Sequence, residues 1–485
     1  MKVRFETTGC RLNQIESESA ARSFIEEKFD VLLAPLTAKS EPDSEASLCV
    51  VNTCAVTQKA EQKDRRIIRL VLEKCPHAVV LVTGCYAQLS SDEIKKMSDR
   101  VAVLPGQLKS RLSEVPSLLR AELLQGNFEP KAFARTLNEG IFARPAQKAG
   151  FSENAFKLST DSFVAHSRSS IKIQDGCNND CTYCTINAAR GHSVSLDAQT
   201  VIDRVIQLEK AGQAEVVFTT VNIGQYRGAY KGGFVCFTEL LELCLKNTSE
   251  IAMRISSLYP EVVDDEFCRV IQNPRVRPHF HISVQSGSDA VLSCMARRYT
   301  AADVREACRR LTLAKQNPFL ACDIITGFPG ETAEDFEATM ALCQDCGFAW
   351  VHVFPFSARP GTAAAVMGGK VPQSVSGERA ARLGAWAEQS KKAYITSCVG
   401  KEFDAVMESV KRPMILSGSF SAPLSASARK HTVYHAVTEN FLHCELLSTA
   451  QNAPEPGSKI RVRIVGIVEA GAVKGGEYDV RAEFV

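Results

Sequence analysis

Short apolar runs alternate with polar segments of helical spacing along most of this 485-residue chain, and this alternation constrains the fold more than any other feature. It is typical of strands and helices that build a parallel sheet with helices on its faces. In the first part of the chain the pattern occurs three times, with helix-like segments at 14–28, 60–74 and 91–97. We therefore predict an N-terminal parallel α/β domain over residues 1–125.

Each of these three apolar runs ends in a turn that carries a cysteine. The runs are "VRFETTGC", "LCVVNTC" and "VVLVTGC", and the cysteines are Cys10, Cys54 and Cys85. A single free cysteine is most often a small buried apolar residue. In open parallel sheets, however, ligands bind beyond the carboxyl ends of the strands, which is where all three fall. The equivalent positions favour one shared site, whereas Cys49 and Cys75 lack the turn and are expected to be packed.

A second set of three cysteines lies in "QDGCNNDCTYCTI", where Cys177, Cys181 and Cys184 form a C-x3-C-x2-C run. A closed structural zinc site needs four ligands. A four-iron four-sulfur cluster held by three cysteines keeps one iron free to bind a small molecule. The run therefore favours such a cluster, and a zinc site completed by His192 is the alternative. The C-x2-C pair at 343–346 lies on a predicted helix with no second pair nearby and is expected to be packed.

The middle of the chain continues the alternation of apolar runs and helix-like segments, the latter including 196–211 and 331–346. The apolar runs are at 170–173, 215–219, 251–256, 279–284, 320–325 and 350–354. Six such units fit a partial (β/α)6 barrel over residues 166–393, with its chemistry at the carboxyl ends of the strands. The C-x3-C-x2-C run directly follows the first of them.

Two further segments flank this barrel. Residues 126–165 have poor periodicity and many Asn, Gly, Ser and Pro residues, which predicts a linker. Residues 394–485 have short runs of period two, which predict a small C-terminal β-barrel. Within it, "KIRVRIV" places Lys459, Arg461 and Arg463 on one strand face, either as an RNA-binding surface or as a solvated edge.

The start of the sequence, "MKVRFETTGCRLNQ", has no apolar run behind its basic residues, and no stretch approaches about 20 uninterrupted apolar residues. We therefore expect a cytoplasmic protein that does not enter a membrane. In a reducing compartment its 18 cysteines are expected to bind metal, act in catalysis or pack, and not to form a disulfide framework. The net charge of +2 gives no electrostatic argument for a nucleic-acid partner.

Several motifs together resemble one family. "GCNNDCTYC" with "ARG" at 189–191 is similar to the cluster motif of the radical S-adenosylmethionine (SAM) methylthiotransferases. "TGCRLNQIESE", "VNTCAVT" and "TGCYAQ" resemble the three blocks of that family's amino-terminal domain, and "HFHISVQSGSD", "RRYT" and "DIITGFPGET" resemble its barrel. The resemblance covers nearly the whole chain, and it places a TRAM domain, an RNA-binding barrel, at the C-terminus.

The resemblance implies two 4Fe–4S clusters. Cys177, Cys181 and Cys184 would hold the cluster that binds and cleaves SAM. Cys10, Cys54 and Cys85 would hold an auxiliary cluster that carries the sulfur to be inserted. A second SAM would donate the methyl group, so the cofactors carry the difficult chemistry and the protein positions them. The residues at the family's SAM-contacting positions are Thr219, Asn222, Gln285, Ser286, Gly327 and Gly330, although Thr220 stands where the family usually has glycine.

"GCRLNQIES" and "IKIQDGCNN" look most like the subfamily that acts on threonylcarbamoyladenosine. This implies a tRNA methylthiotransferase that inserts sulfur and a methyl group into an aromatic C–H of that nucleoside next to the anticodon. Its partners would be tRNA, a sulfur source and an electron donor such as flavodoxin or ferredoxin. The alternatives are a methylthiotransferase acting on isopentenyladenosine or on a ribosomal protein, and a zinc-stabilised RNA-binding protein.

Overall fold

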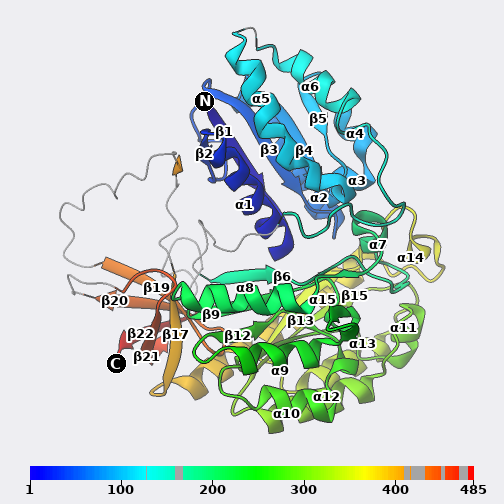
Figure 1. Ribbon diagram of the computed structural model, residues 1–485. Helices are drawn as coiled ribbons and strands as arrows, with labels where there is room; N and C mark the ends of the chain where they lie inside the picture. The colour runs from blue at the N-terminus through cyan, green and yellow to red at the C-terminus, as the bar shows by residue number, and fades with distance from the viewer. Residues whose placement is uncertain (127, 159–167, 409–414, 417–431, 449–453, 469–478) are drawn as a thin grey trace.

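The computed structural model describes residues 1–126, 128–158, 168–408, 415–416, 432–448, 454–468 and 479–485. Three units pack against one another. In Figure 1 the blue and cyan N-terminal sheet lies above the green and yellow central barrel, and the orange and red C-terminal strands lie at its left. The N-terminal strands run toward the barrel, so their carboxyl ends, which carry the first three cysteines, face it.

The N-terminal unit is a sheet in the order β18-β2-β1-β3-β4-β5, parallel throughout except for the edge strand β18. Its strands are β1 (Lys2–Thr7), β2 (Asp30–Leu32), β3 (Ala46–Thr53), β4 (Val79–Gly84), β5 (Val101–Val103) and β18 (Ile415–Leu416). Its helices are α1 (Arg11–Glu26), α2 (Gln58–Lys74), α3 (Cys85–Leu89), α4 (Ser91–Lys95), the 3-10 helix η1 (Gly106–Glu114) and α5 (Val115–Leu124). Strands β3 and β4 are apolar on both faces because a separate apolar cluster packs on each side of the sheet. The predicted parallel α/β domain is confirmed.

The segment 126–165, which composition favours as a linker, contains helix α6 (Pro130–Glu139). Phe133, Ala134 and Leu137 of this helix are buried in the same apolar cluster as β1 and β3. The segment therefore includes part of the N-terminal layer, and spacing within one short helix was too weak a signal to predict it. Residues 127 and 159–165 of the segment lie outside the described residues.

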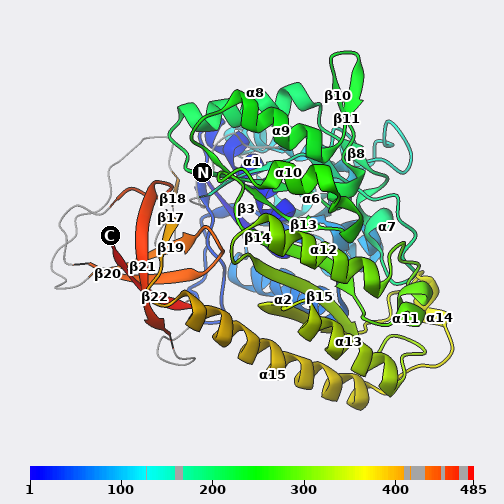
Figure 2. The ribbon, with the colours of Figure 1, turned by 90° about the horizontal axis from the view of Figure 1, so that it is seen from below.

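The central unit is an open barrel of six parallel strand positions. Hydrogen bonds between neighbouring strands join them into two groups, β12-β9-β6 and β13-β14-β15-β16, and a parallel bridge between Met253 and Val276 links the two groups. The strands are β6 (Ser169–Lys172), β9 (Glu215–Thr219), β12 (Ala252–Ile255) continued by β13 (Ser257–Leu258), β14 (His279–Gln285), β15 (Phe319–Thr326) and β16 (Trp350–Pro355). The outer helices are α8 (Ala198–Lys210), α9 (Phe237–Asn247), α10 (Asp265–Ile271), α12 (Ala301–Ala314), α13 (Ala333–Asp345) and the long α15 (Gln373–Cys398). Figure 2 shows these helices around the strands, and the predicted partial barrel is confirmed.

The C-terminal unit is a small closed barrel with the strand order β17-β19-β20-β22-β21. Its strands are β17 (Glu402–Glu408), β19 (Thr432–Thr438), β20 (His443–Ser448), β21 (Lys459–Ile467) and β22 (Val480–Phe484). Alternate residues of β21 point inward, among them Val462 and Ile464, which are fully buried. The small barrel predicted from period two is therefore confirmed.

A buried carboxylate joins the two barrels. Glu215 of β9 accepts hydrogen bonds from Arg254 Nε at 2.7 Å and from Arg277 Nε at 2.9 Å. Arg254 also donates to the carbonyl oxygen of Thr438 in the C-terminal barrel, at 3.1 Å. Burial by itself would raise the pKa of Glu215, but the charges of Arg254 and Arg277 lower it to about 2. The ionised carboxylate therefore stabilises the folded chain.

We expect Glu215→Gln to lower the free energy of unfolding at pH 7, measured by urea unfolding, by about 3 kcal/mol, the value for a carboxyl whose pKa is about 4.3 in the unfolded chain and about 2 in the folded chain. Because the folded pKa lies below the unfolded value of about 4.3, this stabilisation is complete above that pH and is lost as the pH falls toward 2. The difference between wild type and variant should therefore narrow between pH 5 and pH 3. A difference that stays constant over this range would contradict the assignment.

Candidate active site

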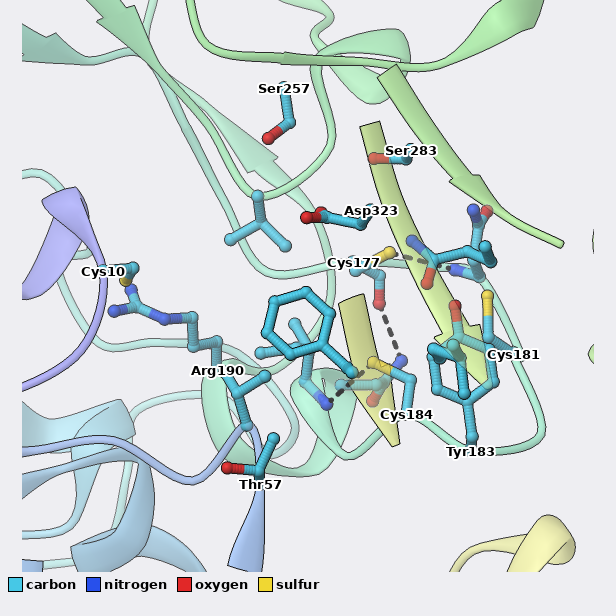
Figure 3. A pocket seen from close by; sticks show the side chains of 18 of the residues that line it. Cys10, Thr57, Cys177, Cys181, Tyr183, Cys184, Arg190, Ser257, Ser283 and Asp323 are labelled. Carbon is cyan, nitrogen blue, oxygen red and sulfur yellow. Dashed lines mark hydrogen bonds between the residues drawn. The ribbon is translucent and has the colours of Figure 1, made fainter. Parts of the chain in front are cut away.

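A cavity of about 490 Å³ lies where the N-terminal domain meets the carboxyl ends of the barrel strands. Its wall includes all three cysteines of the C-x3-C-x2-C run and also Cys10. Figure 3 shows Cys177, Cys181 and Cys184 on one side of this space and Cys10 on the other, with Arg190 between them. Strand ends supply polar groups to the same wall: Thr219, Ser257, Ser283 and Asp323.

The loop that carries the C-x3-C-x2-C run is shaped by Gly176. Its φ is +70°, and a Cβ atom there would lie 2.1 Å from the carbonyl oxygen of His192. Only glycine therefore allows the chain to turn at this point. The loop continues into the short helix α7 (Ile186–Arg190), so the cysteines lie between the first barrel strand and a helix that faces the N-terminal domain.

Each sulfur of this run has a hydrogen-bond donor. The amide N–H groups of Asn179 and Ile186 lie 3.4 Å from Cys177 Sγ and Cys184 Sγ, and Arg297 Nη1 lies 3.3 Å from Cys181 Sγ. Burial raises the pKa of the Cys177 thiol, and a bound cation favours the thiolate form. Three sulfurs with N–H donors around one cavity fit a cluster held by three thiolates.

The first three cysteines lie close to one another at the edge of the N-terminal sheet. Cys10 precedes α1, Cys54 follows β3, and Cys85 begins α3 after β4. A Cβ atom on Gly9, whose φ is +87°, would lie 2.6 Å from Cys54 Cβ, so glycine lets the Cys10 turn approach Cys54. Burial raises the pKa of Cys54 to about 12, and the nearby Cys85 and Cys10 thiols add to this rise. These residues fit an auxiliary cluster, and their role as ligands stays a prediction.

A buried ionic network connects the two cysteine sets. Glu16 of α1 accepts hydrogen bonds from Lys109 Nζ at 2.5 Å and Lys172 Nζ at 2.9 Å, and pairs with Arg190 Nη1 at 3.2 Å. Arg190 also pairs with Asp175 at 2.9 Å. All five groups are at most 8% exposed, and they come from α1, η1, β6, β7 (Gln174–Asp175) and α7. The network fixes the N-terminal domain on the barrel beside the cavity.

The structure brings only part of the predicted SAM-contacting set to the cavity. Thr219 and Gln285 line it, and the buried Thr219 Oγ1 has no hydrogen-bond partner, which leaves it available to a ligand. Asn222 lies behind Cys177, with Nδ2 4.0 Å from its sulfur. The other three predicted residues are not part of the wall: Ser286, Gly327 and Gly330.

Two of these three residues have structural surroundings instead, whereas a Cβ atom on Gly330 would meet nothing within 4 Å. Ser286 is 1% exposed and its hydroxyl lies 3.4 Å from that of Thr339 on α13. Gly327 packs against Ser376 of α15, where a Cβ atom would lie 2.4 Å from the serine side chain. Their contribution to SAM binding stays a prediction, and the glycine at 327 has a packing reason of its own.

The basic residues predicted on the last barrel share one face, but they are paired. Lys459 Nζ and Arg461 Nη1 lie 2.8 and 2.9 Å from the carboxylate oxygens of Asp404. Arg463 pairs with Glu402 at 2.7 Å and with Glu483 at 3.2 Å. Their charge is therefore largely neutralised by neighbouring strands, and RNA binding by this face stays a prediction.

Sequence reasoning assigned no role to two of the groups in the wall. Arg297, which donates to Cys181, lies within "RRYT", a motif that gave the resemblance but no function. Asp323 of β15 lies 3.3 Å from His281 Nε2, and only the folded barrel brings their strands together.

His192, the alternative zinc ligand, contacts Asn178 and packs on Phe151. Within the described residues, no group of three or more His, Cys, Asp and Glu side chains is arranged to hold a single metal ion.

Comparison with known proteins agrees with this architecture. Residues 171–343 match the model of the Radical SAM superfamily, and residues 2–106 match the Uncharacterized protein family UPF0004. The three-cysteine loop, the open barrel and this match together define a radical SAM enzyme. The chain is also similar to the solved structure of the radical S-adenosylmethionine methyltransferase TsrM from Kitasatospora setae. The similarity covers 75% of this chain and 77% of that chain, with 14% identity and a TM-score of 0.49.

Several relatives are similar over most of their length. The chain is 43% identical to threonylcarbamoyladenosine tRNA methylthiotransferase MtaB of Treponema pallidum, over 95% of this chain and 98% of that protein. It is 34% identical to the MtaB of Thermotoga maritima, over 86% and 88%, and 30% identical to tRNA-2-methylthio-N(6)-dimethylallyladenosine synthase of Klebsiella pneumoniae, over 86% and 83%. The chain belongs to the threonylcarbamoyladenosine tRNA methylthiotransferase family. This membership implies SAM and 4Fe–4S clusters as cofactors.

Proposed function

We propose that this protein adds a methylthio group to N6-threonylcarbamoyladenosine beside the anticodon of tRNA. The observation that carries the proposal is that Cys177, Cys181 and Cys184 lie across one cavity from Cys10, where two domains meet. Cys54 and Cys85 lie near Cys10 at the edge of the N-terminal sheet. A set of three cysteines leaves one iron of a four-iron cluster open, as a radical SAM enzyme requires at Cys177, Cys181 and Cys184. The second set would hold a cluster that carries the sulfur. The names of the relatives at 43% and 34% identity support threonylcarbamoyladenosine as the substrate.

When bound, the clusters and SAM supply a carbon radical, the sulfur and the methyl group for an aromatic carbon that acid–base catalysis cannot activate. The residues of the chain position these groups. Arg297 holds the Cys181 sulfur, and its guanidinium lies 4.9 Å from the ring centres of Tyr259 and Tyr299, which keep it in place. Gln174 accepts hydrogen bonds from the amides of Val221 and Asn222, at 3.0 Å each, and so ties the end of β9 to the cysteine loop.

The alternatives have less support. A relative that acts on dimethylallyladenosine is 30% identical, against 43% for a threonylcarbamoyladenosine enzyme. A zinc-stabilised RNA-binding protein would use the cysteines only for structure, whereas the family match covers an enzyme domain. A ribosomal-protein substrate has no observation in its favour.

Basic residues on α2 support an RNA partner. Lys59, Lys63, Arg66 and Arg69 are exposed on one side of this helix, and no ion pair involves them in the described part of the chain. The helix starts at the cavity, because Val56 and its N-cap residue Thr57 line the wall. Unpaired positive charge beside an active site attracts phosphates. We propose that this side of α2 faces the tRNA. This proposal does not depend on RNA binding by the face formed by Lys459, Arg461 and Arg463.

The remaining partners follow from the chemistry. Reductive cleavage of SAM needs an electron donor, such as a flavodoxin or a ferredoxin, and the reaction consumes sulfur that a donor must replace. No helix among the described residues is long and apolar enough to cross a membrane. We propose that the protein works in the cytoplasm, where its tRNA substrate is found.

Deletion of the gene should remove the 2-methylthio derivative of threonylcarbamoyladenosine from total tRNA, because no unassisted reaction inserts sulfur at this carbon. Threonylcarbamoyladenosine itself should accumulate in its place. Mass spectrometry of nucleosides from the deletion strain and from a complemented strain measures both. Loss of the methylthio derivative of isopentenyladenosine instead would favour the alternative tRNA substrate, and unchanged nucleosides would overturn the proposal.

A further inference from the structure

One arginine in the cavity wall has donors that nothing in the fold uses. Arg359 lies in the loop between β16 and α14 (Ala363–Val366), lines the cavity and is 3% exposed. Its Nη2 donates to Glu61 of α2, whereas its Nε and Nη1 are buried without a hydrogen-bond partner. A buried guanidinium with two unused N–H groups is destabilising unless a ligand supplies the acceptors.

The other cavity arginines are already engaged. Arg190 pairs with Glu16 and Asp175, and Arg297 donates to the sulfur of Cys181. Arg11 donates from Nε to Ser170 at 2.9 Å and from Nη2 to a backbone carbonyl. Among the arginines that the structure describes in this wall, Arg359 alone combines burial with two donor atoms that lack an acceptor.

The position of Arg359 is fixed by its neighbours. Gln58 at the start of α2 donates from Nε2 to the carbonyl oxygen of Ala358 at 3.2 Å and from its amide to Ser357 Oγ at 3.3 Å. The loop and α2 therefore form one wall between the two domains. The only side-chain hydrogen bond of the guanidinium among the described residues is the one from Nη2 to Glu61, so Nε and Nη1 are the donors left for a ligand.

We infer that Arg359 binds the carboxylate of the threonylcarbamoyl group and so selects this nucleoside over adenosines with uncharged substituents. The inference rests on the proposed function. A hydrogen bond from a guanidinium to a carboxylate is charge-assisted, which makes it one of the stronger contacts available. An isopentenyl group offers no acceptor and would leave the arginine unpaired. SAM also has a carboxylate, so the test must separate the two sources.

The test uses the cluster-loaded enzyme without oxygen and two anticodon stem-loop RNAs. One carries threonylcarbamoyladenosine, and the other carries the same group with its carboxylate converted to a neutral primary amide. For wild type we expect kcat/KM to be about 100-fold lower on the amide, the range that loss of a charged hydrogen-bonded pair gives. For Arg359→Met we expect a loss of about 100-fold on the carboxylate RNA and no preference between the two RNAs.

Two further variants control for structure. Arg359→Lys keeps the positive charge but loses the planar guanidinium and its spread of donors, and should keep a preference of about tenfold. Glu61→Gln removes the ion pair but keeps the guanidinium, so it should keep the full preference for the carboxylate RNA. If Arg359 acted only through its ion pair with Glu61, this variant would lose the preference. If Arg359→Met does not fold, the preferences of wild type and of Arg359→Lys between the two RNAs still test whether Arg359 binds the carboxylate.

Three results would overturn the inference. The first is that wild type acts equally on both RNAs. The second is that Arg359→Met retains the preference for the carboxylate RNA. The third is that Arg359→Met raises the KM for SAM and leaves the KM for RNA unchanged, which would assign the arginine to SAM. The proposed function fails in a different way, since a wild-type enzyme with bound clusters would then modify neither RNA. If Arg359→Met keeps full activity on the carboxylate RNA and an unchanged preference, the role of Arg359 is rejected and the proposed function is not affected.

Discussion

Cys181→Ala should abolish the cleavage of SAM and therefore all methylthio product. Cys181 is the middle cysteine of the set of three proposed to hold the SAM-binding cluster, and Arg297 Nη1 lies 3.3 Å from its sulfur. With two thiolates left, a cluster that must keep one iron free for SAM has too few ligands to stay bound. The measurement is deoxyadenosine formed with a chemical reductant, together with iron per chain. Deoxyadenosine at the wild-type rate would refute the assignment.

The matched variant is Cys54→Ala, which removes one cysteine from the set proposed to hold the auxiliary cluster. Because Cys54 lies on the N-terminal domain and outside the cavity wall, SAM cleavage should continue in this variant while thiolation of RNA stops. Each variant should lose about half of the iron of the wild type, for which two four-iron clusters give about eight atoms. If Cys54→Ala also stopped SAM cleavage, the two sets would not have separate roles.

Most of the fold could be predicted because it depends on local periodicity. Strands β3 and β4 are buried on both faces and appear in the sequence as continuous apolar runs, which is the signal of a central parallel strand. Helix α6 could not be predicted, because it is short and its stability comes from Phe133 and Leu137 packing on a distant sheet. Strand β2 and the edge strand β18 are too short to leave a periodic signal.

The cysteines of the site could be predicted because each follows a strand, and the ends of parallel strands meet at one edge. The rest of the wall depends on contacts between distant segments. Arg359 meets Glu61 across 298 positions, and Arg190 meets Glu16 across 174, so no local pattern marks these pairs. At Gly327 the motif near a strand end predicts a ligand contact that stays a prediction, and the structure adds a packing reason for glycine there, the close approach of Ser376.

The ion pairs of basic residues could not be predicted from one strand. Alternation in "KIRVRIV" correctly placed three basic residues on one face of β21. Their partners Asp404 and Glu402 lie on β17, more than fifty positions earlier, and the sequence contains no signal for the register between the two strands. Conversely, the basic side of α2 has no partners in the described chain, and its value as an RNA surface depends on the cavity beside it.

Glu16→Ala should be the most destabilising single change in the interface between the N-terminal domain and the barrel. Burial by itself would raise the pKa of Glu16, but Arg190, Lys109 and Lys172 hold it well below its usual range, so the carboxylate is ionised. Its loss leaves three buried cations with Asp175 as their remaining buried acidic partner in this network. Removing one member of a buried ion pair typically costs about 3–5 kcal/mol.

The control is Glu337→Ala, which breaks the ion pair with Arg382 on the surface, where both side chains are more than half exposed. Exposed pairs contribute about 0–1 kcal/mol, so this variant should keep the wild-type midpoint of urea unfolding. Glu16→Ala should unfold at clearly lower urea, and it should lose iron from both cysteine sets, because Glu16 fixes the domain that carries one set against the loop that carries the other. Equal midpoints for the two variants would mean that the buried network contributes no more to stability than a surface pair.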